Sequence, residues 1–152
     1  MFYGGRVANS KRMEPPKMNN RLRLATYAFI PLFLFHQGDH IRRGLGMAST
    51  QLVILGTSGS YAAVATITLV LVKHRWAPLA AFVVGSATAL GFAAVHWLPT
   101  WSVSSDSFTS HHVDWVSWSA SIGEVTGAVL LSLAGIATMR SQAHVQERID
   151  TA

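Results

Sequence analysis

Long uncharged stretches alternate with short charged segments along this chain. Uncharged residues run without interruption from Gly44 to Val72 and again from Ala77 to Val95. A third stretch, from Trp115 to Met139, is uncharged except for Glu124. A transmembrane helix needs about 20 predominantly apolar residues, so each of these stretches is long enough, or nearly long enough, to cross a bilayer.

A fourth apolar run, from Leu24 to Phe35, is shorter than the others. It reaches a spanning length only if the helix continues through His36 to about Ile41. A basic start followed by a short apolar run is also typical of a signal peptide. We favour a helix, because the run begins well inside the chain and no small-residue cleavage pattern follows Phe35.

The pattern predicts an all-α protein, a four-helix transmembrane bundle that occupies residues 22–140. The predicted helices cover approximately 22–43, 45–72, 77–98 and 115–140. Residues 1–21 are basic and poor in apolar side chains, which predicts a disordered cytoplasmic N-terminus, and residues 141–152 form a polar cytoplasmic tail.

Small residues recur at four-residue spacing in the predicted helices. Membrane helices associate through close backbone approach, which such spacing permits, so the pattern predicts a compact bundle. The stripes are Gly56 with Ser60, Gly59 with Ala63, the series Ala81, Gly85, Ala89 and Ala93, and Gly123 with Gly127 and Gly135.

The distribution of charge indicates a membrane protein and sets its predicted orientation. Only 12% of the 152 residues are charged, about half the fraction in soluble domains. The basic residues flank the apolar stretches, which argues against nucleic acid as a partner. With the N-terminus in the cytoplasm, only Arg42 and Arg43 of the 12 lysines and arginines would lie outside. The excess of positive charge predicts a multi-pass membrane protein with both termini cytoplasmic.

Glu124 is the most informative single residue in the apolar stretches. An ionisable side chain at the centre of a bilayer costs at least about 2.5 kcal/mol to insert. Glu124 is therefore expected to face the interior of the bundle and to mark a functional site.

Histidines gather at a similar depth on the predicted outer side. At a rise of 1.5 Å per residue, His36 and Glu124 both lie about 21–22 Å from the inner face. His40 follows His36 by one helical turn on the same face, and His96 ends the third predicted helix. Of the seven histidines, only His74 and His144 fall on the cytoplasmic side.

This cluster is a candidate metal site. The chain contains no cysteine, so imidazole and oxygen ligands are the ones available, and they suit zinc, iron or copper. We predict His36, His40, His96 and Glu124 as ligands, with Asp39, His112 and Asp114 as residues that orient the imidazoles or replace a ligand. Haem held between histidines of facing helices is an alternative.

Each residue also has a structural interpretation. His36 could hydrogen-bond a neighbouring helix, and His40 could form a collar with Arg42 and Arg43 at the lipid headgroups. Asp39 and Arg43, four residues apart, could form an ordinary exposed ion pair.

The segments FHQGDHIRRG and KHRWAPLAAF resemble small four-span integral membrane proteins of actinobacteria, which are uncharacterised. The resemblance covers about Leu22 to Met139. It implies a four-helix protein of the plasma membrane and brings no established activity.

Three functions follow from these observations. The first is a membrane protein that binds a metal or haem on its outer side. The second is an accessory subunit that packs against other membrane subunits or against itself. The third is a proton or ion relay through His36 and Glu124. The sequence contains no nucleophile motif, phosphate loop or dinucleotide fingerprint that would specify an enzyme reaction.

Overall fold

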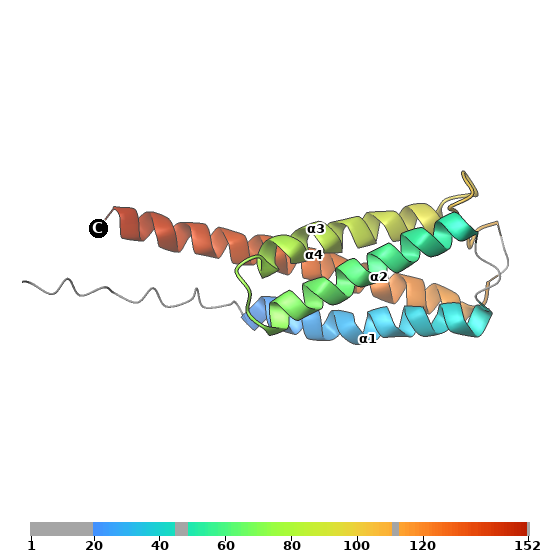
Figure 1. Ribbon diagram of the computed structural model, residues 1–152, viewed down its shortest axis with the longest axis horizontal. Helices are drawn as coiled ribbons and strands as arrows, with labels where there is room; N and C mark the ends of the chain where they lie inside the picture. Colours follow the sequence, from blue (N-terminus) through green and yellow to red (C-terminus); the bar gives the residue numbers. More distant parts are fainter. Residues whose placement is uncertain (1–19, 45–48, 111–112, 152) are drawn as a thin grey trace, which may run out of the picture.

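The computed structural model describes residues 20–44, 49–110 and 113–151, and all the regular secondary structure in these ranges is helical. Figure 1 shows four long helices that run side by side, with the start of α1 and the end of α4 at the same end of the bundle. The elements are α1 (Asn20–Arg43), α2 (Thr50–Leu71), α3 (Ala77–Phe92), a π-helical turn η2 (Ala93–Trp97) and α4 (Trp115–Asp150).

The helices begin at capping residues that the sequence supplies locally. The Ser49 hydroxyl accepts a hydrogen bond from the Leu52 amide, and the Asp114 carboxylate accepts one from the Ser117 amide. Pro78 lies in the first turn of α3, where its missing amide costs nothing. These caps satisfy amides that have no partner within their own helix.

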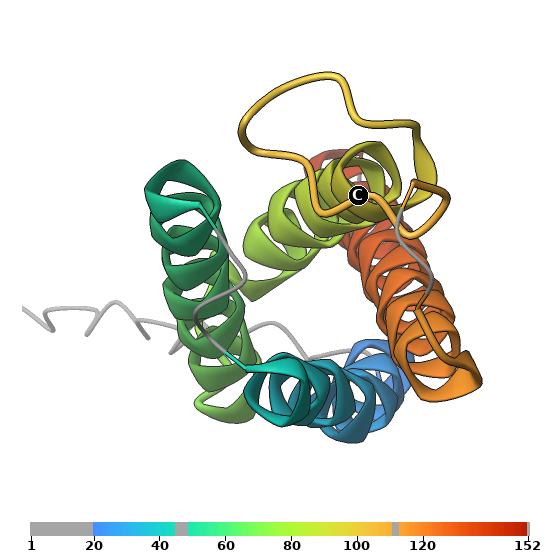
Figure 2. The ribbon, with the colours of Figure 1, turned by 90° about the vertical axis from the view of Figure 1, so that its right-hand side faces the viewer.

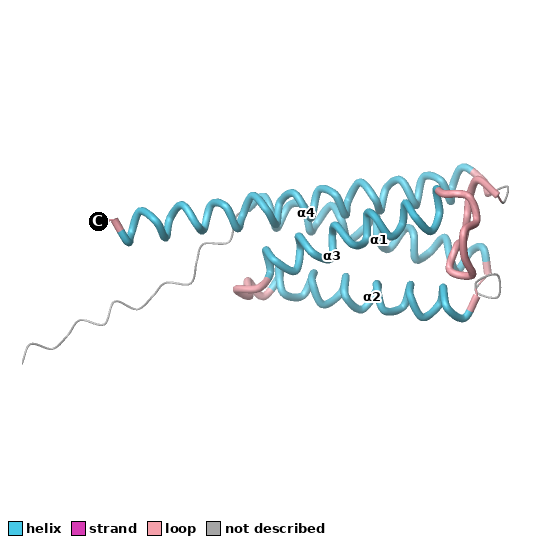
Figure 3. Tube along the Cα trace, turned by 90° about the horizontal axis from the view of Figure 1, so that it is seen from above, coloured by secondary structure: helices cyan, strands magenta, loops and turns pink. Residues whose placement is uncertain are grey.

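Two helix ends differ from the predicted ones. α3 changes to a π-helical turn at Ala93, and α4 continues to Asp150, past the predicted end at 140. Beyond Met139 the side chains become polar, yet they still favour a helix, and Gln146 donates to Asp150 one turn later. Figure 3 shows this part of α4 extending past the ends of α2 and α3.

α3 and α4 pack most closely, because small residues let their backbones meet. A Cβ atom at Gly85 would lie 2.6 Å from the Ala128 carbonyl oxygen, and one at Gly135 would lie 2.6 Å from the Pro78 carbonyl oxygen. Close packing was predicted for these stripes, and it is what the structure has. The stripes of α2 pack less closely: Ala63 is buried, but a Cβ at Gly56 or Gly59 would meet nothing within 4 Å.

The four helices form a ring with α2 opposite α4. Seen along the bundle in Figure 2, α1 packs on α4, and α2 lies against α3 and, more lightly, against α1. Within the described ranges, α2, Ala77–Trp97 and α4 are each long and apolar enough to cross a membrane. α1 falls short of that measure, since the polar residues His36, Gln37 and Asp39 follow its short apolar run.

Candidate metal centre

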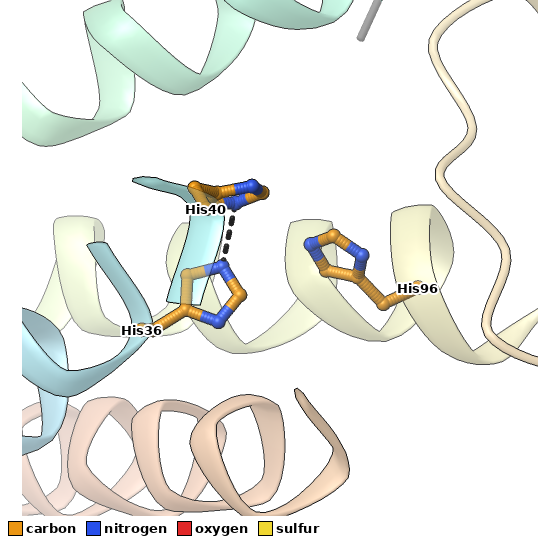
Figure 4. A group of neighbouring side chains, drawn as sticks. All are labelled: His36, His40 and His96. Carbon is orange, nitrogen blue, oxygen red and sulfur yellow. Dashed lines mark hydrogen bonds between the residues drawn. The ribbon is translucent and has the colours of Figure 1, made fainter. Parts of the chain in front are cut away.

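His36, His40 and His96 meet at the end of the bundle where α1 and η2 finish. Figure 4 shows the three imidazoles facing one another, two from α1 and one from η2. Each offers one ring nitrogen to a group whose atoms all lie within 4.8 Å of one another. His36 is fully buried and His96 is 3% exposed, so both side chains point into the bundle.

The two histidines of α1 touch each other directly. Their Nε2 atoms lie 2.8 Å apart, because residues four positions apart stack on one face of a helix. Two nitrogens bound to one tetrahedral zinc lie about 3.4 Å apart, given Zn–N bonds of about 2.0–2.1 Å. The contact of 2.8 Å would therefore have to lengthen for both rings to bind one ion, and the ligand atoms of all three histidines already lie within 4.8 Å of one another.

η2 positions His96, and its backbone carbonyls accept hydrogen bonds from the loop that follows. A π-helical turn widens the helix, and such turns occur frequently at functional sites. The Val95 carbonyl accepts a hydrogen bond of 3.1 Å from the Asp106 amide, and the His96 carbonyl accepts one of 2.8 Å from the Phe108 amide. The loop is thereby tied to the segment that carries His96.

The loop also determines which nitrogen of His96 is free. Nδ1 lies 3.0 Å from the backbone carbonyl oxygen of Asp106, which can only accept, so Nδ1 carries the proton. In Figure 4 the other ring nitrogen turns toward His36 and His40. Metal-binding histidines usually donate their second N–H to a carbonyl or carboxylate in this way.

Aromatic rings enclose the cluster. Phe92 lies with its ring centroid 4.7 Å from that of His36, and Phe108 lies 4.6 Å from His96. Trp118 packs on Phe108 at 5.5 Å. These rings pack against His36 and His96 and hold their imidazoles in place.

An ion pair closes the cluster on the loop side. The Arg43 guanidinium donates two hydrogen bonds to the Asp106 carboxylate, of 2.7 and 2.9 Å, and stacks over the Phe108 ring at 5.1 Å. Burial opposes the ionisation of Asp106, but the hydrogen bonds and charge of Arg43 outweigh it and hold the pKa of Asp106 below its usual range. Arg43 and Asp106 were not among the predicted site residues.

The sequence indicated only part of the ion pair between Arg43 and Asp106. Arg43 shares the face of His36 and His40, since the three occupy positions i, i+4 and i+7. Asp106 lies 63 residues from Arg43, and no local pattern links them. The interpretation of Asp39 with Arg43 as an exposed ion pair was wrong: Asp39 is buried and pairs with Arg42 instead.

Arg42 holds both carboxylates that were predicted to support the imidazoles. It donates to Asp39 at 2.7 and 2.9 Å and to Asp114 at 2.7 and 2.9 Å. This network joins the end of α1 to the start of α4 and places neither carboxylate in a hydrogen bond with a described imidazole. The predicted His112 lies outside the described residues.

The Arg42–Asp114 contact should make the stability of the protein fall as the solution becomes acidic. The hydrogen bond from Arg42 lowers the pKa of Asp114 in the folded state, so the stabilisation is present above about pH 4 and is lost as the pH falls through the folded value. We expect Asp114→Asn, which keeps the helix cap, to show a smaller fall in melting temperature between pH 6 and pH 3 than the wild type. Asp150→Asn, an exposed acid at the far end of α4, is the control; identical curves for Asp114→Asn and wild type would contradict this role.

Glu124 lies inside the bundle but apart from the three histidines. Its side chain is 1% exposed, and it is not part of the group of ligand atoms around His36. Gly123, next to Glu124, faces the side chain of Leu32, which precedes His36 by one turn of α1. No hydrogen bond joins Glu124 to His36 within the described ranges.

Two buried polar atoms have no hydrogen-bond partner within the described ranges, Nδ1 of His36 and Oε2 of Glu124. An unpartnered buried polar atom costs about 1–3 kcal/mol. Such atoms are uncommon in folded proteins, and each calls for an explanation such as a bound ion, a ligand or a catalytic role.

Comparison with known proteins identified no relative. No family model, no curated protein and no solved structure matches this chain.

Proposed function

We propose that this chain is a four-span plasma-membrane protein, with both termini cytoplasmic, that binds a transition-metal ion through His36, His40 and His96 on its outer side. The observation that carries the proposal is the meeting of three buried imidazoles, with the Asp106 carbonyl leaving Nε2 of His96 free to bind. Three neutral imidazoles are the ligands of many zinc, iron and copper sites.

The surface of the bundle supports a membrane location. Large apolar side chains are exposed on every helix, among them Leu34, Ile54, Leu90 and Leu133, while the interior holds His36 and Glu124. Exposed apolar surface of this extent is unfavourable in water and suits lipid. α1 lies lengthwise among three membrane-length helices, and its 24 residues span about 36 Å, so it would cross with them.

A metal ion suits this site better than haem. The ring centroids of His36 and His40 lie 4.5 Å apart, and His96 lies 5.4 Å from His36 and 5.9 Å from His40. Rings in such direct contact leave no room for a porphyrin plane between them. Three protein ligands would leave one tetrahedral position for water or a substrate, as catalytic zinc sites do.

Metal analysis of the purified protein tests the proposal. The protein should carry a tag without histidine, and we expect about one equivalent of zinc, iron or copper per chain. Replacement by cobalt(II) should give the visible absorption of a nitrogen-ligated site. Protein that neither contains nor takes up a metal would favour a proton relay through His36 and Glu124, whose unpartnered atoms suit one, or an accessory subunit.

The orientation has its own test. Because positive charge is retained in the cytoplasm, a reporter that works only in the cytoplasm should be active when fused after Ala152. A reporter that works only outside should be active when inserted near Ser105. Three spans instead of four would place the two ends on opposite sides, and a reporter at the N-terminus would then report the outside.

A further inference from the structure

A cavity of about 700 Å³ lies between α1, α2 and α3, beside the histidine cluster. Its volume is in the range of about 300–1,000 Å³ that is typical of small-molecule sites. His40 and His96 line it at one end, and Glu124 reaches it from α4. Most of the remaining wall is apolar, including Phe33, Leu52 and Val84.

Glycines create this space. Gly56 and Gly59 on α2 and Gly91 on α3 line the cavity, and a Cβ atom at any of them would meet nothing within 4 Å. At Gly85 and Gly135, in contrast, a Cβ would press on backbone atoms. The first set therefore widens a cavity, whereas the second set lets two helices touch.

One polar group in this apolar wall lacks a partner. Oε2 of Glu124 is buried and accepts no hydrogen bond from any residue in the described ranges, although its side chain lines the cavity. Burying such a group is unfavourable unless something else satisfies it. A ligand that brings a hydrogen-bonding group to Glu124 would satisfy this buried oxygen.

We infer that the cavity binds a neutral amphiphile with a long apolar chain and a hydroxyl head group, the hydroxyl meeting Glu124 and the chain lying along the glycines of α2 and α3. A neutral head group is indicated because Arg43, which also lines the cavity, is already paired with Asp106. The head group would then lie beside the histidine cluster. This inference rests on the proposed membrane location, since the bilayer supplies such molecules, and it does not require a bound metal.

Photolabelling tests the inference. The full-length protein in lipid nanodiscs would be exposed to hexadecanol that carries a diazirine on its chain, and labelled peptides would be identified by mass spectrometry. We expect saturable labelling of α2 and α3. Excess hexadecanol without the diazirine should prevent this labelling, whereas hexadecane should compete poorly. Gly56→Leu with Gly91→Leu should lower the labelling at least about tenfold, because the two side chains fill the space that the ligand needs.

Two further variants distinguish the outcomes. Gly38→Leu alters an exposed glycine of α1 that lies outside the cavity, so its labelling should equal that of the wild type. Glu124→Leu should remove the preference for hexadecanol over hexadecane while the protein remains folded by circular dichroism. Labelling that does not saturate or that is equal in all variants would overturn the inference. Spontaneous cross-linking of two copies through a cysteine at Ser58, which lines the cavity, would also overturn it, because a second copy would then cover the cavity. Chelator-treated protein should label equally, which separates this result from the metal analysis.

Discussion

Replacing His96 with alanine is expected to abolish stable metal binding. His96 is the proposed ligand from η2, and without it both remaining imidazoles come from one turn of α1. Loss of an outer partner of a metal ligand already weakens binding about 10–100-fold, so loss of the ligand itself should exceed 100-fold. Metal content after dialysis and competition with a chromophoric chelator would measure the change.

The other histidines and Glu124 provide the controls for that result. His144→Ala removes an exposed histidine at the far end of α4 and should leave the metal content unchanged. His36→Ala should behave like His96→Ala. We expect Glu124→Gln to keep its metal, because the carboxylate lies outside the histidine group; loss of metal in this variant would instead restore Glu124 as a ligand.

Replacing Gly135 with alanine is expected to lower the free energy of unfolding by about 2–3 kcal/mol. The added methyl carbon would lie 2.6 Å from the Pro78 carbonyl oxygen and 2.8 Å from the Phe82 amide nitrogen. Both are backbone atoms that cannot rotate away, so α3 and α4 would have to separate. Titration with a denaturing detergent, followed by circular dichroism, would measure the change.

Gly38→Ala is the matched control, with the opposite expected sign. Gly38 is exposed in the middle of a helix, and an added methyl group would meet nothing within 4 Å. Alanine should therefore stabilise the bundle by about 0.5–1 kcal/mol, since glycine loses more backbone freedom on folding. Equal effects at Gly38 and Gly135 would show that helix propensity decides both, and that close approach of α3 and α4 does not.

The helices and the burial of their polar residues could be predicted from sequence, since hydropathy and capping act locally. Uncharged runs predicted α2, α3 and most of α4, and the end of α1 at 43 agrees with the structure. The cost of placing Glu124 in an apolar segment predicted that it would face inward, and Glu124 is buried, as is His36. The polar residues after Met139 hid the rest of α4, because hydropathy measures suitability for lipid and not the tendency to form a helix.

Which residues contact each other between helices was far less predictable from sequence, as the small residues show. Gly56 and Gly135 have the same spacing signal, yet one borders a cavity and the other touches a neighbouring backbone. Spacing shows which residues share a helix face, but the direction of that face depends on how the whole bundle packs. For Gly56, the position of α2 opposite α4 decides the direction of that face.

The sequence by itself determined that His36 and His40 share one face of a helix and that Glu124 has to be buried, because helical periodicity and the cost of charge in an apolar segment are local properties. Only the tertiary structure decided that His96 completes the cluster, that the Asp106 carbonyl selects its tautomer and that Arg43 binds Asp106. These contacts join a helix to a turn or loop far along the chain. They depend on the unwinding of α3 into η2 and on the path of the loop after it, and residue type and spacing encode neither.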